Sequence, residues 1–307
     1  MKARAFSPAG ISSFFQACLW DSKGELLKDP ALIGSRGGGI VIKKGVITEL
    51  EAVPSDKTTI KVFINNKLTP NAHTTKTAVE LVLKEIELAY EVTIKHQIEV
   101  PISAGYGTSG AGALSSVIAL NELLELKLSK HDIGRIAHIA EVVCHTGLGS
   151  VSGILNGGLV LVKVPGVDGL LKIEHIPINS KWRVVTALVS PIRTRGVISS
   201  HEALRKINEY GEITLRSIIE NPTVDHFFKS CKDFAINTGL MSVLIKKMTD
   251  AAVENGALGA TQNMIGDGMH AIVEPSFLTS VVAALGNYIN KEKIIVSDID
   301  LNGPILL

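Results

Sequence analysis

The residues best suited to do chemistry lie together in one glycine-rich stretch, between Pro101 and Ala113. Four of its thirteen residues are glycine, and Thr108 and Ser109 add two hydroxyl groups. An apolar run from Leu114 to Leu120 follows and predicts a helix. Small residues directly before a helix let backbone N–H groups approach an anion at the positive end of the helix dipole. The stretch is therefore expected to bind a phosphate group.

The motif alone leaves open which phosphate ligand this loop binds. Gly105–Gly110 match the dinucleotide pattern G-x-G-x-x-G, which also needs a second parallel strand after the helix and an acidic residue about 20 positions on. Only the short Leu126–Leu128 follows, and Glu125, at the required spacing, would lie on the helix itself. No G-x-x-x-x-G-K-[ST] occurs, so the loop is not a Walker A motif. A dinucleotide-dependent oxidoreductase is therefore a disfavoured alternative.

The elements around this loop can be predicted from hydrophobic periodicity. Apolar residues alternate with polar ones over Val92–Val100, which predicts a strand with one buried face directly before the loop. Thr75–Tyr90 has helical spacing and leads into that strand. After the loop helix, Ser129–Asp132 resemble a capping box that starts a second helix, Ile133–Cys144. Glu141 lies late in that helix, where a lone glutamate is usually solvated.

The N-terminal part alternates predicted strands with irregular segments. Lys2–Phe6 predicts a short strand, and Ser7–Phe15, punctuated by Pro and Gly, predicts a turn-rich stretch. The polar segment Asp21–Ile33 predicts an excursion without regular structure. The glycines of Gly34–Gly39 indicate either backbone that approaches a ligand or an ordinary turn at the start of a strand, and both interpretations stay open. Further strands are predicted at Ile40–Leu50, Thr58–Ile64 and Gly157–Val164.

A boundary is predicted near Pro165-Gly166, which gives two domains, 1–166 and 167–307. The second half is predicted to form an α+β unit distinct from the first. Gly256–Gly268 is expected to form a second glycine-rich loop. The predicted strands here are Leu171–Ile176, Trp182–Val189, Met269–Val273 and Ile294–Val296, and the predicted helices are Glu202–Glu220, Val224–Asn237, Leu240–Glu254 and Ser276–Ile289.

Composition limits the classes of partner. The 307 residues carry a formal net charge of +1 with 20% charged residues, so no basic surface for nucleic acid is indicated. Three widely separated cysteines form neither a disulfide framework nor a zinc motif, which favours a reducing, cytoplasmic compartment. No signal peptide or membrane span is predicted. We expect a small-molecule ligand and no membrane partner, and a homodimer is one assembly that the sequence allows.

Three stretches resemble motifs of the GHMP kinase family, whose members act on small molecules such as galactose, homoserine and mevalonate. The stretches occur in the same order as in that family. Pro101–Ala113 is similar to their central loop P-x-x-x-G-[LIY]-G-[ST]-S-[AG]-[AG], Ser7–Phe15 lies at the place of their first motif, and Gly256–Gly266 at that of their third. The resemblance implies an α+β fold of two domains, with an N-terminal ribosomal-protein-S5-like domain 2 and a C-terminal ferredoxin-like domain. It places the ATP and substrate cleft between them.

Within that family, four sequence segments resemble the archaeal members that act on pantoate. They are Ser7–Phe15, Gly34–Gly39, Ala140-Glu141 with Thr146–Gly149, and Thr261–Gly266. This resemblance implies transfer of phosphate from ATP to the primary hydroxyl of (R)-pantoate, giving 4-phosphopantoate on the way to coenzyme A. The alternatives are a homoserine- or mevalonate-like GHMP kinase and a non-catalytic nucleotide-binding sensor of the same fold.

The resemblance also assigns site residues. Backbone amides of the loop would bind the ATP phosphates, and Ser109 and Glu141 would hold Mg²⁺ with the oxygen ligands that this ion takes. Pantoate carries a carboxylate, for which Arg36 is the first choice, before Arg193 and Arg195. Hydrogen bonds to the substrate are expected from Ser12, Ser13 and Asn156. The cofactor-binding set is Pro101, Ala104, Gly105, Tyr106, Gly107, Thr108, Ser109, Gly110 and Ala111.

Two positions depart from the family pattern. Gly10 stands where relatives that act on pantoate commonly have His, and Ser150 stands near the place where many GHMP kinases have Asp. No general base is therefore evident at the expected places. Phosphoryl transfer through a loose transition state depends chiefly on positioning and charge stabilisation, so catalysis does not require one. Among the histidines, His96 is expected to be a hydrogen-bonded core residue.

Overall fold

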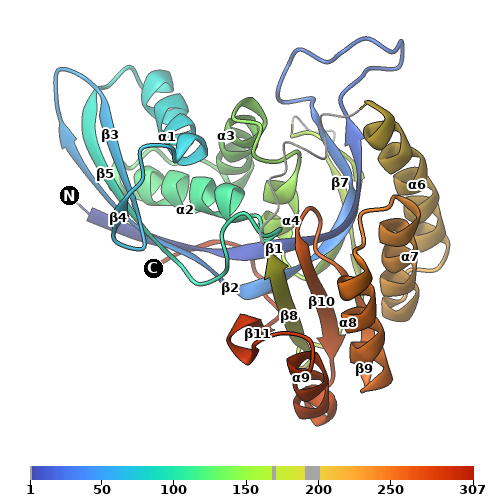
Figure 1. The fold of residues 1–307 in the computed structure, drawn as a ribbon. Helices are drawn as coiled ribbons and strands as arrows, with labels where there is room; N and C mark the ends of the chain where they lie inside the picture. The colour runs from blue at the N-terminus through green and yellow to red at the C-terminus, as the bar shows by residue number, and fades with distance from the viewer. Residues whose placement is uncertain (1, 168–170, 191–200) are drawn as a thin grey trace.

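Two β-sheets organise the chain (Figure 1). The computed structural model describes residues 2–167, 171–190 and 201–307, and of residue 201 only the backbone. The first sheet has the order β12-β1-β2-β5-β3-β4, with β6 paired to β2 and β7 to β6, and the second has the order β11-β8-β10-β9. The strands are β1 (Lys2–Cys18), β2 (Gly34–Pro54), β3 (Thr59–Ile64), β4 (Lys67–Leu68), β5 (Tyr90–Ile98), β6 (Leu159–Val164), β7 (Lys172–Ile176), β8 (Arg183–Ser190), β9 (Ala257–Gln262), β10 (Asp267–Val273), β11 (Ile294–Asp298) and β12 (Ile305–Leu306).

The helices form two groups around these sheets. Helices α1 to α3 cover one face of the first sheet, and α6 and α7 lie beside the junction of the two sheets (Figure 1). The predicted α+β fold class is confirmed. The helices are α1 (His73–Glu85), α2 (Thr108–Leu123), α3 (Lys130–Val143), α4 (Ser150–Asn156), α6 (His201–Glu220), α7 (Val224–Asn237), α8 (Val243–Glu254) and α9 (Leu278–Gly286), with 3-10 turns η1 (Pro275–Phe277) and η2 (Lys291–Lys293).

Helix α2 is the centre of the first layer. Its residues Leu114, Val117 and Leu120 are fully buried against β1 and β2, with α1 and α3 on either side. The helix begins at Gly107, which adopts a left-handed conformation (φ 60°) that glycine takes without strain. The predicted capping box at Ser129 is present: its side chain accepts from the Asp132 N–H, and the Asp132 carboxylate accepts from the Ser129 N–H. These local signals fix where the two helices start.

The prediction of a turn-rich stretch at Ser7–Phe15 was wrong, and Gly34–Gly39 are part of strand β2 and not a turn before it. Both belong to one long antiparallel pair, β1 with β2, in which bulges at Pro8/Ala9 and Ser12/Phe14 absorb the turn-forming residues. The glycines are required by the close approach of β1: a Cβ at Gly39 would stand 2.2 Å from the Ile11 carbonyl oxygen. The polar excursion Asp21–Ile33 is confirmed as the connection between the strands.

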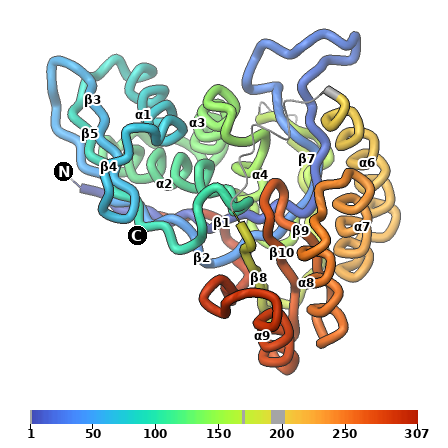
Figure 2. Tube along the Cα trace, viewed as in Figure 1, coloured from blue at the N-terminus to red at the C-terminus, as the bar shows by residue number. Residues whose placement is uncertain are grey.

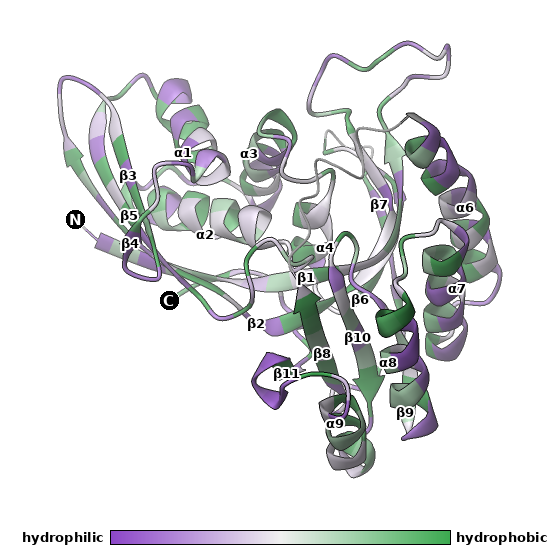
Figure 3. Ribbon diagram, viewed as in Figure 1, coloured by the Kyte–Doolittle hydropathy of each residue, from purple (hydrophilic) through white to green (hydrophobic). Residues whose placement is uncertain are grey.

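The second sheet packs on α8 and α9, and its neighbours tie it to β1. Strands β8 and β10 are hydrophobic over most of their length (Figure 3). Phe14 of β1 makes edge contacts with Phe227 and Phe234 of α7, at ring distances of 6.2 and 6.1 Å. The prediction of Gly256–Gly268 as one loop was wrong, because its first part is strand β9. There Gly259 leaves room for Phe228, whose Cβ would stand 2.4 Å from an added Cβ.

Two late strands return to the first sheet. β7 pairs with β6, and the C-terminal β12 pairs with β1 at Ala5 and Phe6, so the two ends of the chain lie at the same sheet edge (Figure 2). The division into domains 1–166 and 167–307 stays a prediction. No helix in the described part of the chain is long and apolar enough to cross a membrane.

Candidate active site

A cavity of about 450 Å³ opens where β1, the start of α2, the end of α3, the start of α4 and the loop after β9 meet. Its volume lies within the range of about 300–1,000 Å³ that small-molecule sites occupy. The lining comes from both halves of the chain. It consists of Gly10, Ser12 and Phe15 of β1, Ser35 of β2, Ser103–Ser109, Glu141 of α3, His145–Ser150, and Met264 and Ile265 after β9.

The predicted phosphate loop forms one wall of this cavity. Seven consecutive residues, Ser103–Ser109, line it, and the last two are the first residues of α2. The N–H groups of the first helical turn have no acceptor within the helix, so they are available to an anion in the cavity. Pro101, Gly110 and Ala111 do not line it. Gly110 lies behind the loop, where an added Cβ would stand 2.8 Å from the Ser150 Oγ.

The loop between β9 and β10 closes over the phosphate loop. The Met264 N–H donates to the Ser12 carbonyl at 2.8 Å, which joins this loop to β1. A Cβ at Gly266 would stand 2.8 Å from the Ala104 carbonyl oxygen, and one at Gly105 would stand 3.1 Å from the Asn263 Cβ. The three motifs Ser7–Phe15, Pro101–Ala113 and Gly256–Gly266, which lie far apart in the sequence, therefore meet at one cavity.

Glu141 is the buried carboxylate of the site. Its side chain is 1% exposed, its Oε1 accepts from the Ser150 hydroxyl, and its Oε2 has no hydrogen-bond partner in the described structure. Burial raises the pKa of Glu141, while the Ser150 hydroxyl and the N–H groups of Val151, Ser150 and Gly149 act in the opposite direction. A buried carboxylate oxygen without a partner has the chemistry of a cation ligand.

A magnesium ion fits this set of groups. Glu141, which carries the unpartnered Oε2, and Ser109 line the same cavity as the rest of the phosphate loop. The described residues contain no cluster of three or more His, Cys, Asp or Glu side chains that could hold a metal ion. Mg²⁺ does not need one, because it is commonly held by one or two carboxylates together with substrate phosphates.

Comparison with known proteins decides the family. Residues 73–160 match the family described as GHMP kinases N terminal domain. The pantoate kinase of Methanocaldococcus jannaschii is 32% identical over 92% of this chain and 97% of its own length. The chain belongs to the GHMP kinase family.

Further relatives agree with that assignment. The pantoate kinase of Methanospirillum hungatei is 32% identical over 88% of this chain and 87% of its own length. A solved structure titled "Phosphotransferase related to CoA biosynthesis pathway" superposes with a TM-score of 0.87, at 22% identity, over 100% of this chain and 99% of that one. This GHMP kinase is therefore an enzyme that acts on a small molecule, and the predicted fold is confirmed.

The two departures from the family pattern lie side by side in this GHMP kinase. A Cβ at Gly10 would stand 2.8 Å from Ile154 Cγ1 and 4.0 Å from the Ser150 carbonyl oxygen. Ile154 therefore occupies the space into which a side chain at position 10 would extend. Ser150 uses its hydroxyl to hold Glu141, so it is part of the carboxylate site.

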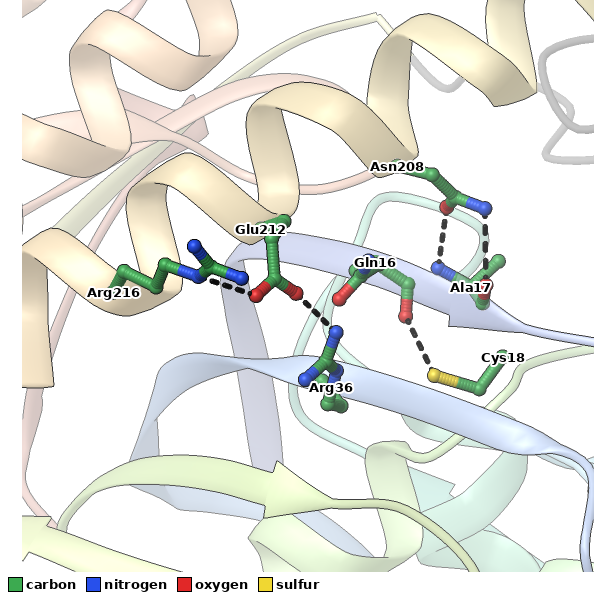
Figure 4. Close-up of polar contacts among 7 residues, drawn as sticks. All are labelled: Gln16, Ala17, Cys18, Arg36, Asn208, Glu212 and Arg216. Atoms are coloured by element: carbon green, nitrogen blue, oxygen red, sulfur yellow. Dashed lines mark hydrogen bonds and ion pairs between the residues drawn. The ribbon is translucent and has the colours of Figure 1, made fainter. Parts of the chain in front are cut away.

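Several predicted substrate residues lie away from the cavity. The Ser13 hydroxyl is buried and bonded to His270 Nε2 at 2.9 Å, and Asn156 Nδ2 donates to the Ser152 carbonyl at 2.8 Å. Arg36 does not line the cavity, since its Nη2 pairs with Glu212 of α6, as Figure 4 shows. Ser12 does line it. Arg193 and Arg195 lie outside the described residues.

Sequence reasoning missed some lining residues. Ser35 and Phe15 line the cavity from the β1 and β2 pair, and Thr146 and Leu148 line it from the segment after α3. Each of these four residues lies in a sequence segment that resembles the family, so the resemblance could have indicated the segments. Nothing local indicated which side chain in each stretch faces the cavity, and for Phe15 and Ser35 this depends on the pairing of β1 with β2.

Proposed function

We propose that this GHMP kinase transfers phosphate from ATP to the primary hydroxyl of (R)-pantoate in a Mg²⁺-dependent reaction, giving 4-phosphopantoate for coenzyme A synthesis. One structural observation carries the nucleotide part: Glu141, whose buried Oε2 has no hydrogen-bond partner in the described structure, lines the same cavity as the phosphate loop and Ser109. Similarity to two proteins named pantoate kinase, each 32% identical over most of the chain, supports the acceptor.

The chain's groups divide into a nucleotide side and an acceptor side. Amides of Gly105–Ser109 bind the phosphates at the positive end of α2. Ser109 and Glu141 hold Mg²⁺, which neutralises charge on the phosphates when bound. Ser12 of β1 and Ser35 of β2 also line the cavity, and we assign their hydroxyls to the acceptor.

The acceptor's carboxylate needs a cation. Among the described residues that line the cavity there is no Lys or Arg, and Arg36 directly follows the lining residue Ser35. We assign the carboxylate to Arg36, whose guanidinium has to leave Glu212 to bind it. Arg193 and Arg195 remain proposed contributors. A planar guanidinium can bind both carboxylate oxygens, and this selects for an acid over a neutral alcohol.

Proton removal from the acceptor does not require a dedicated base in this site. The titratable side chains among the described lining residues are Tyr106, Glu141 and His145, and the Tyr106 hydroxyl is bonded to Thr186 at 2.8 Å. In a loose phosphoryl-transfer transition state the attacking hydroxyl keeps its proton late, so alignment and charge stabilisation supply most of the rate.

An acceptor panel tests this proposal. The purified protein is incubated with ATP and MgCl₂ and with (R)-pantoate, homoserine or mevalonate in turn. ADP release gives kcat/KM, and ³¹P NMR identifies the product. Pantoate is expected to give the highest kcat/KM, with 4-phosphopantoate as the product. A higher value for homoserine or mevalonate would reassign the acceptor, and ATP binding without turnover of any acceptor would indicate a non-catalytic sensor.

A further inference from the structure

A chain of five buried side chains connects strand β1 to the phosphate loop. Ser13 Oγ contacts His270 Nε2 at 2.9 Å, and His270 Nδ1 contacts Asn263 Oδ1 at 2.8 Å. Asn263 Nδ2 donates to Thr186 Oγ1 at 3.3 Å, and the Tyr106 hydroxyl contacts the same Thr186 oxygen at 2.8 Å. We call these five residues the buried hydrogen-bond chain. It joins β1, β8, β10, the loop after β9 and the phosphate loop.

The direction of every bond in the buried hydrogen-bond chain follows from one end. The Thr186 hydroxyl donates its proton to the Met269 carbonyl at 2.7 Å, so its oxygen accepts from both Tyr106 and Asn263. Asn263 Oδ1 can only accept, so His270 Nδ1 carries the proton and His270 Nε2 accepts from Ser13. Each polar group therefore has one role. Removal of the Ser13 hydroxyl leaves His270 Nε2 without a donor, and removal of the Tyr106 hydroxyl detaches the phosphate loop from Thr186.

All five side chains are shielded from water. Ser13, Thr186, Asn263 and His270 are 0% exposed and Tyr106 is 1% exposed. Burial lowers the pKa of His270 to about 3, so the neutral tautomer persists at physiological pH. A lost bond inside such a network is not replaced by a bond to solvent. The network is consequently rigid for as long as it is intact.

Only Tyr106 among the five lines the cavity, and it lies between two glycines with positive φ, Gly105 at 80° and Gly107 at 60°. Glycines in this region give a loop many accessible conformations. The buried Tyr106 side chain is what anchors the loop between them. On the other side, Ser12, next to Ser13, accepts the Met264 N–H at 2.8 Å.

We propose that the buried hydrogen-bond chain sets the conformation of the phosphate loop, which makes Ser13 and His270 positioning residues for ATP although neither lines the cavity. This inference rests on the proposed ATP site. It changes the expected role of Ser13 from a substrate ligand to a residue that acts on the nucleotide through His270, Asn263 and Thr186. A network that served stability alone would not affect ATP affinity.

A double-mutant cycle at the two ends tests the proposal. Ser13→Ala and Tyr106→Phe each remove one hydroxyl, and Ser116→Ala is the matched control. Ser116 is a fully buried hydroxyl on α2 that donates to the Gly112 carbonyl at 2.7 Å, outside the network. Calorimetry gives the Kd of MgATP without an acceptor, ADP release gives KM for ATP and for pantoate, and thermal unfolding gives Tm.

Each single variant is expected to raise the Kd and KM for ATP about fivefold, the factor that one hydrogen bond is worth. The double variant should stay near about fivefold, because residues that act as one unit are not additive. The KM for pantoate should change less than about twofold, and Ser116→Ala should lower Tm without changing the Kd for ATP.

Three results would overturn the inference. The first is a Ser13→Ala variant with a lowered Tm and an unchanged Kd for ATP. The second is a double variant whose Kd rises by the product of the single effects, about 25-fold. The third is a Ser13→Ala variant in which only the KM for pantoate rises. Failure of the proposed acceptor is distinguishable, because the calorimetry needs no acceptor. A wild-type protein that binds no ATP would overturn both.

Discussion

The position of the Glu141 carboxylate can be tested without removing it, by the addition of one methyl group at Gly147. A Cβ there would stand 2.2 Å from Glu141 Oε1 and 2.5 Å from its Cδ. Ordinary van der Waals contact begins at 3.4 Å, so the carboxylate has to move by the difference of 1.2 Å. The φ of Gly147 lies outside the left-handed region, so alanine fits its backbone and the effect is steric.

The expected loss follows from that displacement. A misplacement of about 1 Å at a reacting centre costs roughly 100-fold in rate, so kcat/KM for ATP should fall by about that factor in Gly147→Ala. The fold should survive, because one extra methyl in a packed site costs about 1–3 kcal/mol. Gly153→Ala on α4 is the control. Its Cβ would meet Val160 Cγ2 at an ordinary 3.4 Å, so activity should stay near that of the wild type.

The assay is ADP release with MgCl₂ varied at each ATP concentration, together with thermal unfolding of both variants. Gly147→Ala is expected to need more MgCl₂ than the wild type, and Gly153→Ala is expected to need the same amount. A Gly147→Ala enzyme with kcat/KM within roughly threefold of the wild type and an unchanged MgCl₂ requirement would refute the assignment of Glu141 to the metal.

Three further predictions follow from charges in the structure. Arg36→Ala should raise the KM for pantoate about 10- to 100-fold and leave the KM for ATP unchanged. Glu212→Gln removes the ion pair with Arg36 and should not raise the KM for pantoate. Equal increases of the KM for pantoate in both variants would make the pair purely structural. Burial raises the pKa of Glu141, and protons compete with Mg²⁺ for its carboxylate. The MgCl₂ requirement should therefore rise as the pH falls, and the rise should begin at a higher pH than that at which an exposed glutamate titrates. A MgCl₂ requirement that stays constant down to about pH 5 would contradict this. Burial lowers the pKa of His96 to about 4, so the unfolded chain binds a proton below about pH 6.5 that the folded protein does not, and this group alone should lower the free energy of unfolding by about 2 kcal/mol between pH 7 and 5. Buried His270, with a pKa of about 3, adds a similar loss. In urea unfolding His96→Gln should therefore lose about 2 kcal/mol less than the wild type over this range, and the exposed His131→Gln should lose as much as the wild type.

Local patterns predicted the elements whose signals lie within a few residues. The strand β5, the loop before α2 and the capping box of α3 were found because alternation, glycine content and cap residues are each local. His96 was expected to be a bonded core residue, and it contacts Thr48 at 2.8 Å and Thr75 at 3.0 Å. Such features depend little on where the rest of the chain lies, so a sequence is enough to locate them.

The failures share one physical cause, which is pairing between residues distant in sequence. Pro and Gly in Ser7–Phe15 are turn signals in isolation, but pairing of β1 with Gly34–Gly39 of β2 makes both segments strand. Ser13 and Arg36 were predicted to bind substrate, and neither contact that the structure shows for them is local. Ser13 contacts His270, 257 positions away, and Arg36 pairs with Glu212, 176 positions away. No local pattern contains that information.

The two departures from the family pattern are explained by one element, α4. Ser150 and Ile154 are four residues apart on this helix, so they lie on the same face. That face meets Glu141 through Ser150 and the backbone of Gly10 through Ile154. A larger side chain at position 10 would push against Ile154 and hence shift the helix whose Ser150 hydroxyl donates to Glu141. The absence of the expected base residues is therefore coupled to the packing that orients Glu141, and a chain with this α4 is consistent with catalysis by positioning and charge.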